Sequence, residues 1–386
     1  MSPQPRSLPP SPIAFVDLAA QQSGIRGNIE EAMGRVMDHG HYIMGPEVTE
    51  LEDGLGIYCN AKHVISCSSG TDALLMFLMA KGIGPGDAVI CPAFTFTATP
   101  EGIALIGASP VFADVELDTF NLDPEGIEAA IDSARAAGLT PRGIFAVDLF
   151  GLPADYDRIE AVADAYNLWV LADAAQSFGA SYKDARVGTL ATATVTSFFP
   201  AKPLGCYGDG GAIFTEDVSL AAELQSLRVH GKGTDKYDNV RVGLNARLDT
   251  LQAAILLEKL KIFPDELARR NIVAQIYTET LPASVTPAQL SNHSLSAWAQ
   301  YSVLVGDGKR DHLSAELKKR GVPTAIYYPK PLHEQTAYRG FPKSQGGLAV
   351  AERLPHDILS LPMHPYLTPE QQHYITSAIA EILGQS

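Results

Sequence analysis

The fold of this chain is first indicated by the stretch VISCSSGTDALLMFLMAK, residues 64–81. Its beginning, 64–68, is a short apolar run of the kind found in buried β-strands, and 71–81 has the apolar content and length of a helix. A Ser-Ser-Gly sequence separates the two segments. The stretch therefore predicts a strand that leads through a turn into a helix, which is the repeating unit of α/β sheets.

The same alternation continues through the middle of the chain. Six further apolar runs, most of them rich in β-branched or aromatic residues, read as strands: 88–94, 110–115, 143–150, 169–174, 194–199 and 211–215. Helical patterns lie between several of them, for example at 124–137 and 155–166. We expect a three-layer α/β domain, with a mostly parallel seven-stranded sheet between helices and ligands bound at the carboxyl ends of its strands.

The pattern changes after residue 215. The later elements that we expect are a long helical stretch at 248–277, a strand at 301–305, a helix at 311–320, an extended segment at 324–329 and a helix at 369–383. Because proline breaks helices, we expect an interruption near Pro264. We therefore divide the chain into a disordered tail (1–12), a large domain (13–264) and a small C-terminal α/β domain (265–386).

Composition and charge exclude several classes of function. The 386 residues are 46% hydrophobic and 19% charged, which is typical of a globular protein, and 29 Lys and Arg against 44 Asp and Glu give a net charge of −15. So acidic a surface disfavours nucleic acid and anionic membranes as partners. We find no apolar run of the roughly 18 to 20 residues that cross a bilayer, and no secretory signal in the first dozen residues.

The cysteines and histidines indicate neither disulfides nor a metal site. The cysteines lie in or near apolar stretches and form no Cys-x-x-Cys motif: Cys59, Cys67, Cys91 and Cys206. We expect free thiols in a reducing cytoplasm. His39 and His41 are two residues apart, and the chain lacks a His-Glu-x-x-His motif, so we expect no metal.

The first candidate site is the turn SSGTDAL, residues 68–74. Unpaired amides at a helix N-terminus, with Gly70 allowing close approach and the hydroxyls of Ser69 and Thr71 nearby, form an anion site suited to a phosphate. The alternative is that Ser69 or Thr71 only caps the helix.

The second candidate is Asp173, in LADAAQS (171–177) at the end of an apolar strand. A carboxylate there is costly unless it meets a cation or a strong donor, and the protonated ring nitrogen of a cofactor would serve. The alternative is that Asp173 caps the following turn.

The third candidate is Lys202, in TSFFPAKPLGCYGDGG (196–211). An apolar setting just beyond a strand end suggests a lysine with a lowered pKa and a nucleophilic amine, and the four glycines behind it allow an irregular backbone around a ligand. The alternative is a surface lysine whose stem only covers apolar area. A phosphate site, a carboxylate for a ring nitrogen and a reactive lysine are together what pyridoxal 5′-phosphate (PLP) requires.

The chain at this point resembles a known family, the DegT/StrS-type sugar aminotransferases, which have the fold type I architecture of aspartate aminotransferase. Its motifs occur in order along nearly the whole chain: FVDL (15–18), GPEV (45–48), SGTDAL (69–74), PAFTF (92–96), DAAQ (173–176), the Lys202 segment, NARLD (245–249) and SLPMHP (360–365). FFP (198–200), LGCY (204–207) and PMH (362–364) are most similar to the branch that aminates the 3-keto carbon of a UDP-linked uronic acid derived from N-acetylglucosamine.

This resemblance implies a role for each matching residue. Lys202 would bind PLP covalently, and Asp173 would keep the pyridine nitrogen protonated. The remaining cofactor contacts would be Ser69, Gly70, Thr71 and Ser197 around the phosphate, Phe96 stacked on the ring, Gln176 at the 3′-oxygen and Asn245 from a neighbouring subunit. Arg247 would bind the substrate carboxylate across a homodimer with shared active sites, or else form an ion pair with Asp249 or Glu258 at a helix start.

One motif departs from the branch. We expect His-Tyr-Pro where this chain has Tyr327, Tyr328 and Pro329, and the change removes a possible cation near a sugar acid. The two tyrosines are therefore candidates for substrate binding or for strand packing.

The predicted activity is transfer of the amino group of glutamate, leaving 2-oxoglutarate, to a nucleotide-linked keto sugar in amino-sugar biosynthesis for bacterial surface polysaccharide. The alternatives are a C4-keto-sugar aminotransferase using a UDP- or dTDP-linked sugar, a broad amine transaminase, a dehydratase and a PLP-binding regulator without activity. Lys202 opposes the dehydratase, because a histidine stands there in such relatives.

Overall fold

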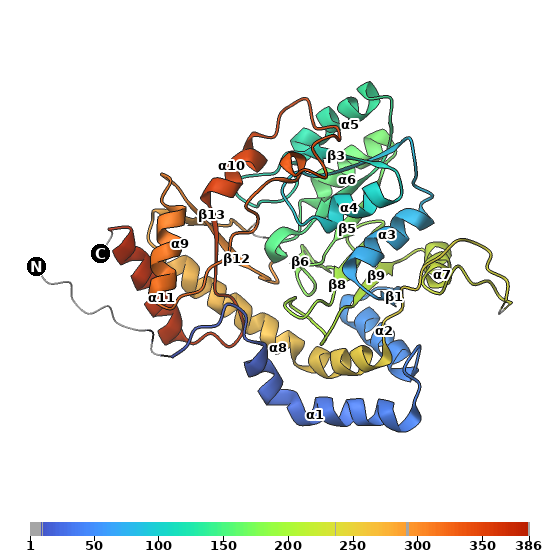
Figure 1. Ribbon diagram of the computed structural model, residues 1–386, viewed down its shortest axis with the longest axis horizontal. Helices are drawn as coiled ribbons and strands as arrows, with labels where there is room; N and C mark the ends of the chain where they lie inside the picture. The colour runs from blue at the N-terminus through green and yellow to red at the C-terminus, as the bar shows by residue number, and fades with distance from the viewer. Residues whose placement is uncertain (1–8, 10, 236, 291–292, 385–386) are drawn as a thin grey trace, which may run out of the picture.

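The computed structural model describes residues 9, 11–235, 237–290 and 293–384, and a seven-stranded sheet lies at its centre (Figure 1). Most of the tail expected at 1–12 lies outside the described residues. The strands are, in spatial order, β1 (His63–Cys67), β9 (Gly211–Thr215), β8 (Ala193–Ser197), β5 (Trp169–Asp173), β4 (Thr140–Val147), β2 (Asp87–Pro92) and β3 (Ser109–Ala113). β9 pairs antiparallel with β1 and β8 and so runs against the other six strands. The predicted mostly parallel sheet is confirmed, and each strand lies on one of the seven apolar runs.

Both faces of this sheet are buried, which is why its strands appear in the sequence as continuous apolar runs. In β2, Val89 and Cys91 face one hydrophobic cluster, and Ala88 and Ile90 face the opposite one. The first face is covered by α3 (Gly70–Ala80), α4 (Ala98–Leu105) and α7 (Val218–Leu227). The second face is covered by α5 (Ile127–Ala136), α6 (Tyr156–Tyr166) and α2 (Pro46–Cys59), with short 3-10 turns at η1 (Pro124–Gly126) and η2 (Leu149–Gly151). The predicted three-layer architecture is therefore confirmed.

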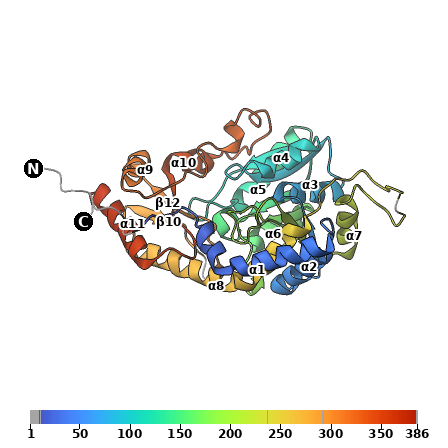
Figure 2. The ribbon, with the colours of Figure 1, turned by 60° about the horizontal axis from the view of Figure 1, so that its bottom comes forward.

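Two long helices, α1 (Leu18–His39) and α8 (Thr250–Thr280), lie side by side below the sheet (Figures 1 and 2). α8 runs unbroken through Pro264, so the predicted interruption there is wrong. A proline inside a helix costs about 3 kcal/mol, but tertiary burial of neighbours such as Phe263 offsets that cost. The expected domain boundary, between residues 264 and 265, thus falls inside α8. The first half of this helix packs on the large sheet, and the second half, near Tyr277, packs on the C-terminal part.

The C-terminal part is built on an antiparallel sheet of β10 (Val285–Pro287), β12 (Tyr301–Val305) and β13 (Ile358–Leu361), covered by α9 (Arg310–Lys319) and α11 (Pro369–Ile382). The elements predicted at 301–305, 311–320 and 369–383 are confirmed. The segment 324–329 makes a single bridge, between Ala325 and Ser360. η3 (Leu332–Glu334) and α10 (Ala349–Asp357) instead pack on the core of the large sheet.

A small sheet of β6 (Ser181–Tyr182), β7 (Ala185–Arg186) and β11 (Ser294–Leu295) also joins the two parts of the chain. All four cysteines are buried free thiols, as expected. Among the described residues, the helices are too short or too polar to span a membrane.

Candidate active site

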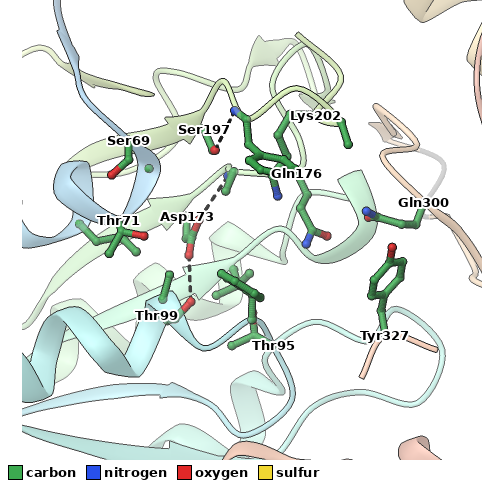
Figure 3. A pocket seen from close by; sticks show the side chains of 18 of the residues that line it. Ser69, Thr71, Thr95, Thr99, Asp173, Gln176, Ser197, Lys202, Gln300 and Tyr327 are labelled. Atoms are coloured by element: carbon green, nitrogen blue, oxygen red, sulfur yellow. Dashed lines mark hydrogen bonds between the residues drawn. The ribbon is translucent and has the colours of Figure 1, made fainter. Parts of the chain in front are cut away.

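A cavity of about 450 Å³ opens at the carboxyl ends of the parallel strands, where the α/β pattern places ligand sites (Figure 3). Loops after β1, β2, β5 and β8 form most of its walls. Its lining residues are Ser69, Gly70, Thr71, Leu74, Thr95, Phe96, Ala98, Thr99, Val147, Asp173, Ala175, Gln176, Ser197, Phe199, Ala201, Lys202, Asp209, Gln300, Tyr327 and Tyr328. All three segments predicted to carry chemistry therefore meet in one cavity.

The N-terminus of α3 forms one end of this cavity. Ser69 Oγ accepts a hydrogen bond from the amide of Asp72 (3.0 Å), so its capping role is confirmed, and Ser69 also lines the cavity. A Cβ on Gly70 would lie 2.8 Å from the Cβ of Ser197, so glycine is what lets the helix start approach the end of β8. The amides of a first helical turn have no partner within the helix and favour an anion, and Thr71 adds a hydroxyl to the same end.

Asp173 lies on the cavity floor and is 5% exposed. Its carboxylate accepts hydrogen bonds from the hydroxyl of Thr99 (3.0 Å) and from the amide of Ala175 (3.2 Å). Burial raises the pKa of this carboxyl, while the two donors and the nearby Lys202 oppose that shift. The bond to Ala175 is the turn-capping contact considered from the sequence, but the other oxygen faces Thr99 and the cavity (Figure 3). A cationic group of a ligand in the cavity would stabilise the ionised carboxylate.

Lys202 faces the same cavity from a loop that folds back on itself. Its amide donates to the carbonyl of Phe199 (2.9 Å), and a Cβ on Gly205 would lie 2.5 Å from the carbonyl oxygen of Pro200. The side chain is half-buried, and desolvation lowers the pKa of its amine to about 8, against an opposing effect of Asp173. Because Lys202 lines the cavity, its side chain does not only cover apolar area on the outer surface, as the alternative required. An amine with such a pKa is a nucleophile near neutral pH.

Aromatic and amide side chains form the opposite wall. Phe96 is 53% exposed, and its ring lies 6.2 Å from that of Tyr328. Gln176 Oε1 accepts a hydrogen bond from the amide of Phe150 (2.6 Å), and Gln176 Nε2 donates to the hydroxyl of Tyr328 (3.3 Å). Tyr327 also lines the cavity. The two tyrosines thus belong to the site as well as to the packing of this segment.

Asn245 and Arg247 lie outside the cavity of this chain, in the segment 228–249 between α7 and α8, part of which projects from the body (Figures 1 and 2). The guanidinium of Arg247 donates to Asn245 Oδ1 at 3.1 and 2.7 Å. Arg35 and Lys261 instead form the ion pairs with Glu258, one of the two acidic partners considered for Arg247. Neither Asn245 nor Arg247 is among the residues that line the cavity of their own chain.

Sequence reasoning missed four residues of this region. Thr95 lies inside the motif PAFTF (92–96), in which only Phe96 was given a role. Thr99 follows that motif in α4, and Gln300 precedes β12. The fourth, Asp148, is fully buried behind the site, and its amide donates to the carbonyl of Asp173 (3.0 Å).

Asp148 holds together the loops behind the cavity floor. Its carboxylate accepts hydrogen bonds from the amide of Ala154 (2.9 Å) and from the hydroxyls of Tyr156 (2.7 Å) and Ser177 (2.6 Å). Burial raises its pKa to about 7. Contacts between separate loops create this network, so no local sequence pattern predicts the role of Asp148.

The residues of the cavity fit PLP. Thr95 Oγ1 is buried and has no hydrogen-bond partner in the described part of the chain. The glycine at the start of α3 leaves space beside the helix N-terminus, and an amine and a buried carboxylate face the same cavity. A cofactor with a phosphate, polar ring substituents, a ring nitrogen and an aldehyde satisfies these groups together. On this fold, they define the site of a PLP-dependent enzyme.

Comparison with known proteins defines the enzyme further. Residues 24–380 match the DegT/DnrJ/EryC1/StrS aminotransferase family, and the chain belongs to that family. It is 48% identical, over 95% of its length and 99% of the relative, to the UDP-2-acetamido-2-deoxy-3-oxo-D-glucuronate aminotransferase of Pseudomonas aeruginosa.

Two crystal structures show the same fold. The chain is 50% identical to a DegT/DnrJ/EryC1/StrS aminotransferase from Brucella abortus, with a TM-score of 0.95 over 97% of this chain and 100% of that one. It is 30% identical to NtdA from Bacillus subtilis, solved with bound cofactor PMP, with a TM-score of 0.86 over 96% of this chain and 83% of that one. The predicted family, enzyme class and PLP cofactor are thereby confirmed.

Proposed function

We propose that this enzyme transfers the amino group of glutamate to the 3-keto carbon of a UDP-linked 2-acetamido-2-deoxy uronic acid. The observation that carries the proposal is the meeting of Lys202, Asp173 and the start of α3 in one cavity. The relative from Pseudomonas aeruginosa, named for this substrate and matched over nearly the full length of both chains, supports the choice of sugar.

Lys202 and Asp173 carry the central chemistry. PLP, when bound, supplies an electron sink that allows an amino group to move between carbon atoms. Lys202 Nζ would hold the cofactor, and its amine, with a pKa of about 8, is suited to take a proton from the carbon that bears the amino group. Asp173, buried and bonded to Thr99, keeps the pyridine nitrogen protonated.

The other lining residues orient the cofactor and exclude water. Gly70, Thr71 and Ser197 hold its phosphate, with Ser69 beside them. Phe96 covers the ring, and Gln176 contacts the 3′-oxygen. Their common position in the cavity lining supports these roles. The close approach of Gly70 to Ser197 brings the start of α3 and the end of β8 together at the phosphate-binding end of the cavity.

A homodimer completes the site. Asn245 and Arg247 lie outside their own cavity, and the nearby Val240 and Val242 are 56% and 85% exposed. In the dimer, this segment reaches the neighbouring cavity, where Asn245 meets the cofactor phosphate and Arg247 binds the sugar carboxylate through a planar, bidentate contact. The exposed valines are buried by the same contact.

The physiological setting is amino-sugar biosynthesis for a bacterial surface polysaccharide, in the cytoplasm. Four buried free thiols suit a reducing compartment. Glutamate and nucleotide sugars, the two reactants, are intermediates of cytoplasmic metabolism.

A panel of acceptors tests the proposed function. The enzyme loaded with the aminated cofactor is mixed with 3-keto and 4-keto sugars linked to UDP or dTDP, and with pyruvate as a simple keto acid. We expect the absorbance of lysine-bound cofactor to return fastest with the UDP-linked 3-keto uronate. A faster return with a 4-keto sugar, or with pyruvate, would overturn the proposal in favour of a C4 enzyme or a broad transaminase.

A further inference from the structure

The loop that carries Lys202 is closed at its base. The amide of Cys206 donates to the carbonyl of Phe198 (2.8 Å), and Lys202 lies midway between these two residues. The segment 205–211, which leads away from Lys202, contains four glycines. Because glycine leaves a backbone many conformations, contacts from outside the loop must select one of them.

Lys259 of α8 makes such a contact from a buried position. It is 1% exposed, and its Nζ donates to the carbonyl of Gly205 (2.6 Å) and lies 4.3 Å from the centre of the Tyr207 ring. Desolvation lowers the pKa of this amine to about 8, while Glu266 and Cys206 oppose that shift. Burying an amine is costly, and a methionine would fill similar space without that cost. The amine therefore points to a role for its hydrogen bond to the loop.

Gln252 holds the next part of the same loop. Its Oε1 accepts a hydrogen bond from the amide of Tyr207 (2.8 Å), and its Nε2 donates to the carbonyl of Tyr207 (3.3 Å). Gln252 and Lys259 are seven residues apart, which is about two helical turns, so they lie on one face of α8. Together they bind the loop through its backbone between residues 205 and 207.

α8 gives this loop a well-packed support. Its first half packs against α1 and α2, and Leu204 of the loop lies in the same hydrophobic cluster as Leu256 and Phe263 of α8. Apolar packing has no preferred direction, whereas hydrogen bonds do, so the polar contacts set how the loop lies on the helix. The rate of a reaction depends strongly on how its groups are placed, and Lys202 is three residues from Gly205.

We propose that Lys259 and Gln252 are positioning residues, which hold the loop so that Lys202 Nζ faces the aldehyde of PLP. This inference rests on the proposed function, in which Lys202 binds the cofactor, and adds the residues that set the position of its amine. Neither side chain is among those that line the cavity, so both act through the loop. The start of α3, where the phosphate binds, is a separate element, and loss of these contacts should leave it in place.

The test separates the binding of PLP from its covalent attachment. Cofactor-free enzyme is mixed with increasing PLP, and absorbance follows the attachment, in which the nitrogen of Lys202 replaces the aldehyde oxygen and water leaves. The half-saturating concentration reports binding, and the limiting rate reports attack by Lys202. The variants are Lys259→Met, which loses the donor, and Gln252→Leu, which loses both hydrogen bonds without a change of charge. Lys261→Met, at an exposed lysine of α8, is the matched control.

We expect the limiting rate to fall about tenfold or more in both variants, with the half-saturating concentration within about twofold of the wild type and Lys261→Met unchanged. Circular dichroism shows which variants are folded, and Gln252→Leu decides the matter if Lys259→Met is not. An unchanged limiting rate in either folded variant would overturn the inference, even if the half-saturating concentration rises, because the residue would then have only a structural role.

The proposed function is checked separately in the wild type. Borohydride reduction followed by peptide mass spectrometry identifies the lysine that binds PLP. A label on Lys202, with variants that attach PLP as fast as the wild type, would overturn the inference alone. A label on another lysine would refute the role of Lys202 in the proposed function, and the inference would fail with it.

Discussion

The lowered pKa of Lys202 predicts how fast the cofactor-free enzyme takes up PLP at each pH. Only the neutral amine attacks an aldehyde, and burial holds the pKa at about 8 instead of 10.5. At pH 7.5 about a quarter of the lysine is then neutral, against about one part in a thousand for an ordinary lysine, which gives a difference of about 200-fold. The rate of covalent binding should therefore level off above pH 8.

The assay follows the absorbance of protein-bound PLP after mixing with cofactor-free enzyme between pH 6 and 10. Lys202→Ala gives the background from other lysines, and borohydride reduction with peptide mass spectrometry identifies the modified residue. Because the charge of Asp173 raises the pKa of Lys202, Asp173→Asn should move the inflection below 8. An inflection above about 9.5 in the wild type, or an upward move in the variant, would refute this reasoning.

Three further predictions concern cofactor binding, stability and assembly. Gly70→Ala places a Cβ 2.8 Å from that of Ser197, so the affinity for PLP should fall about tenfold or more. Fluorescence titration measures this affinity, and an unchanged value would contradict phosphate binding at the start of α3. Burial raises the pKa of Asp148 to about 7, so the stability that its protonated form contributes is complete below about pH 4 and is lost as the pH rises through 7. The thermal midpoint of the wild type should therefore fall between pH 5 and pH 8, and that of Asp148→Asn, which cannot ionise, should fall less. Equal falls in the two proteins would disprove this. Lys202→Ala and Arg247→Ala should each be inactive. When subunits of the two variants are exchanged, about half of the randomly paired dimers contain one intact site, so about a quarter of wild-type activity should return. If no activity returns although exchange is proven, each site belongs to a single chain.

The seven strands could be predicted because each is buried on both faces. A strand of this kind is apolar along most of its length, so burial is visible in about five consecutive residues, as in Gly211–Thr215. The strand β13 was missed because its apolar segment is only four residues long and directly follows α10, which contains Pro355. The error at Pro264 has another cause, because the packing of α8 against α1 and α2 outweighs the local cost of proline.

The sequence alone determined which residues could carry the chemistry. Asp173 ends a buried strand, and Lys202 and the Ser69–Gly70–Thr71 turn each follow one. Their position at the carboxyl edge of the sheet therefore followed from the alternation of strands and helices. The tertiary structure decided what surrounds them. Thr99 reaches Asp173 from 74 residues away, and Gln300 reaches the cavity from beyond α8, because chain reversals bring distant loops to one edge. The burial that lowers the pKa of Lys202 is a property of that assembled cavity, which no single segment contains.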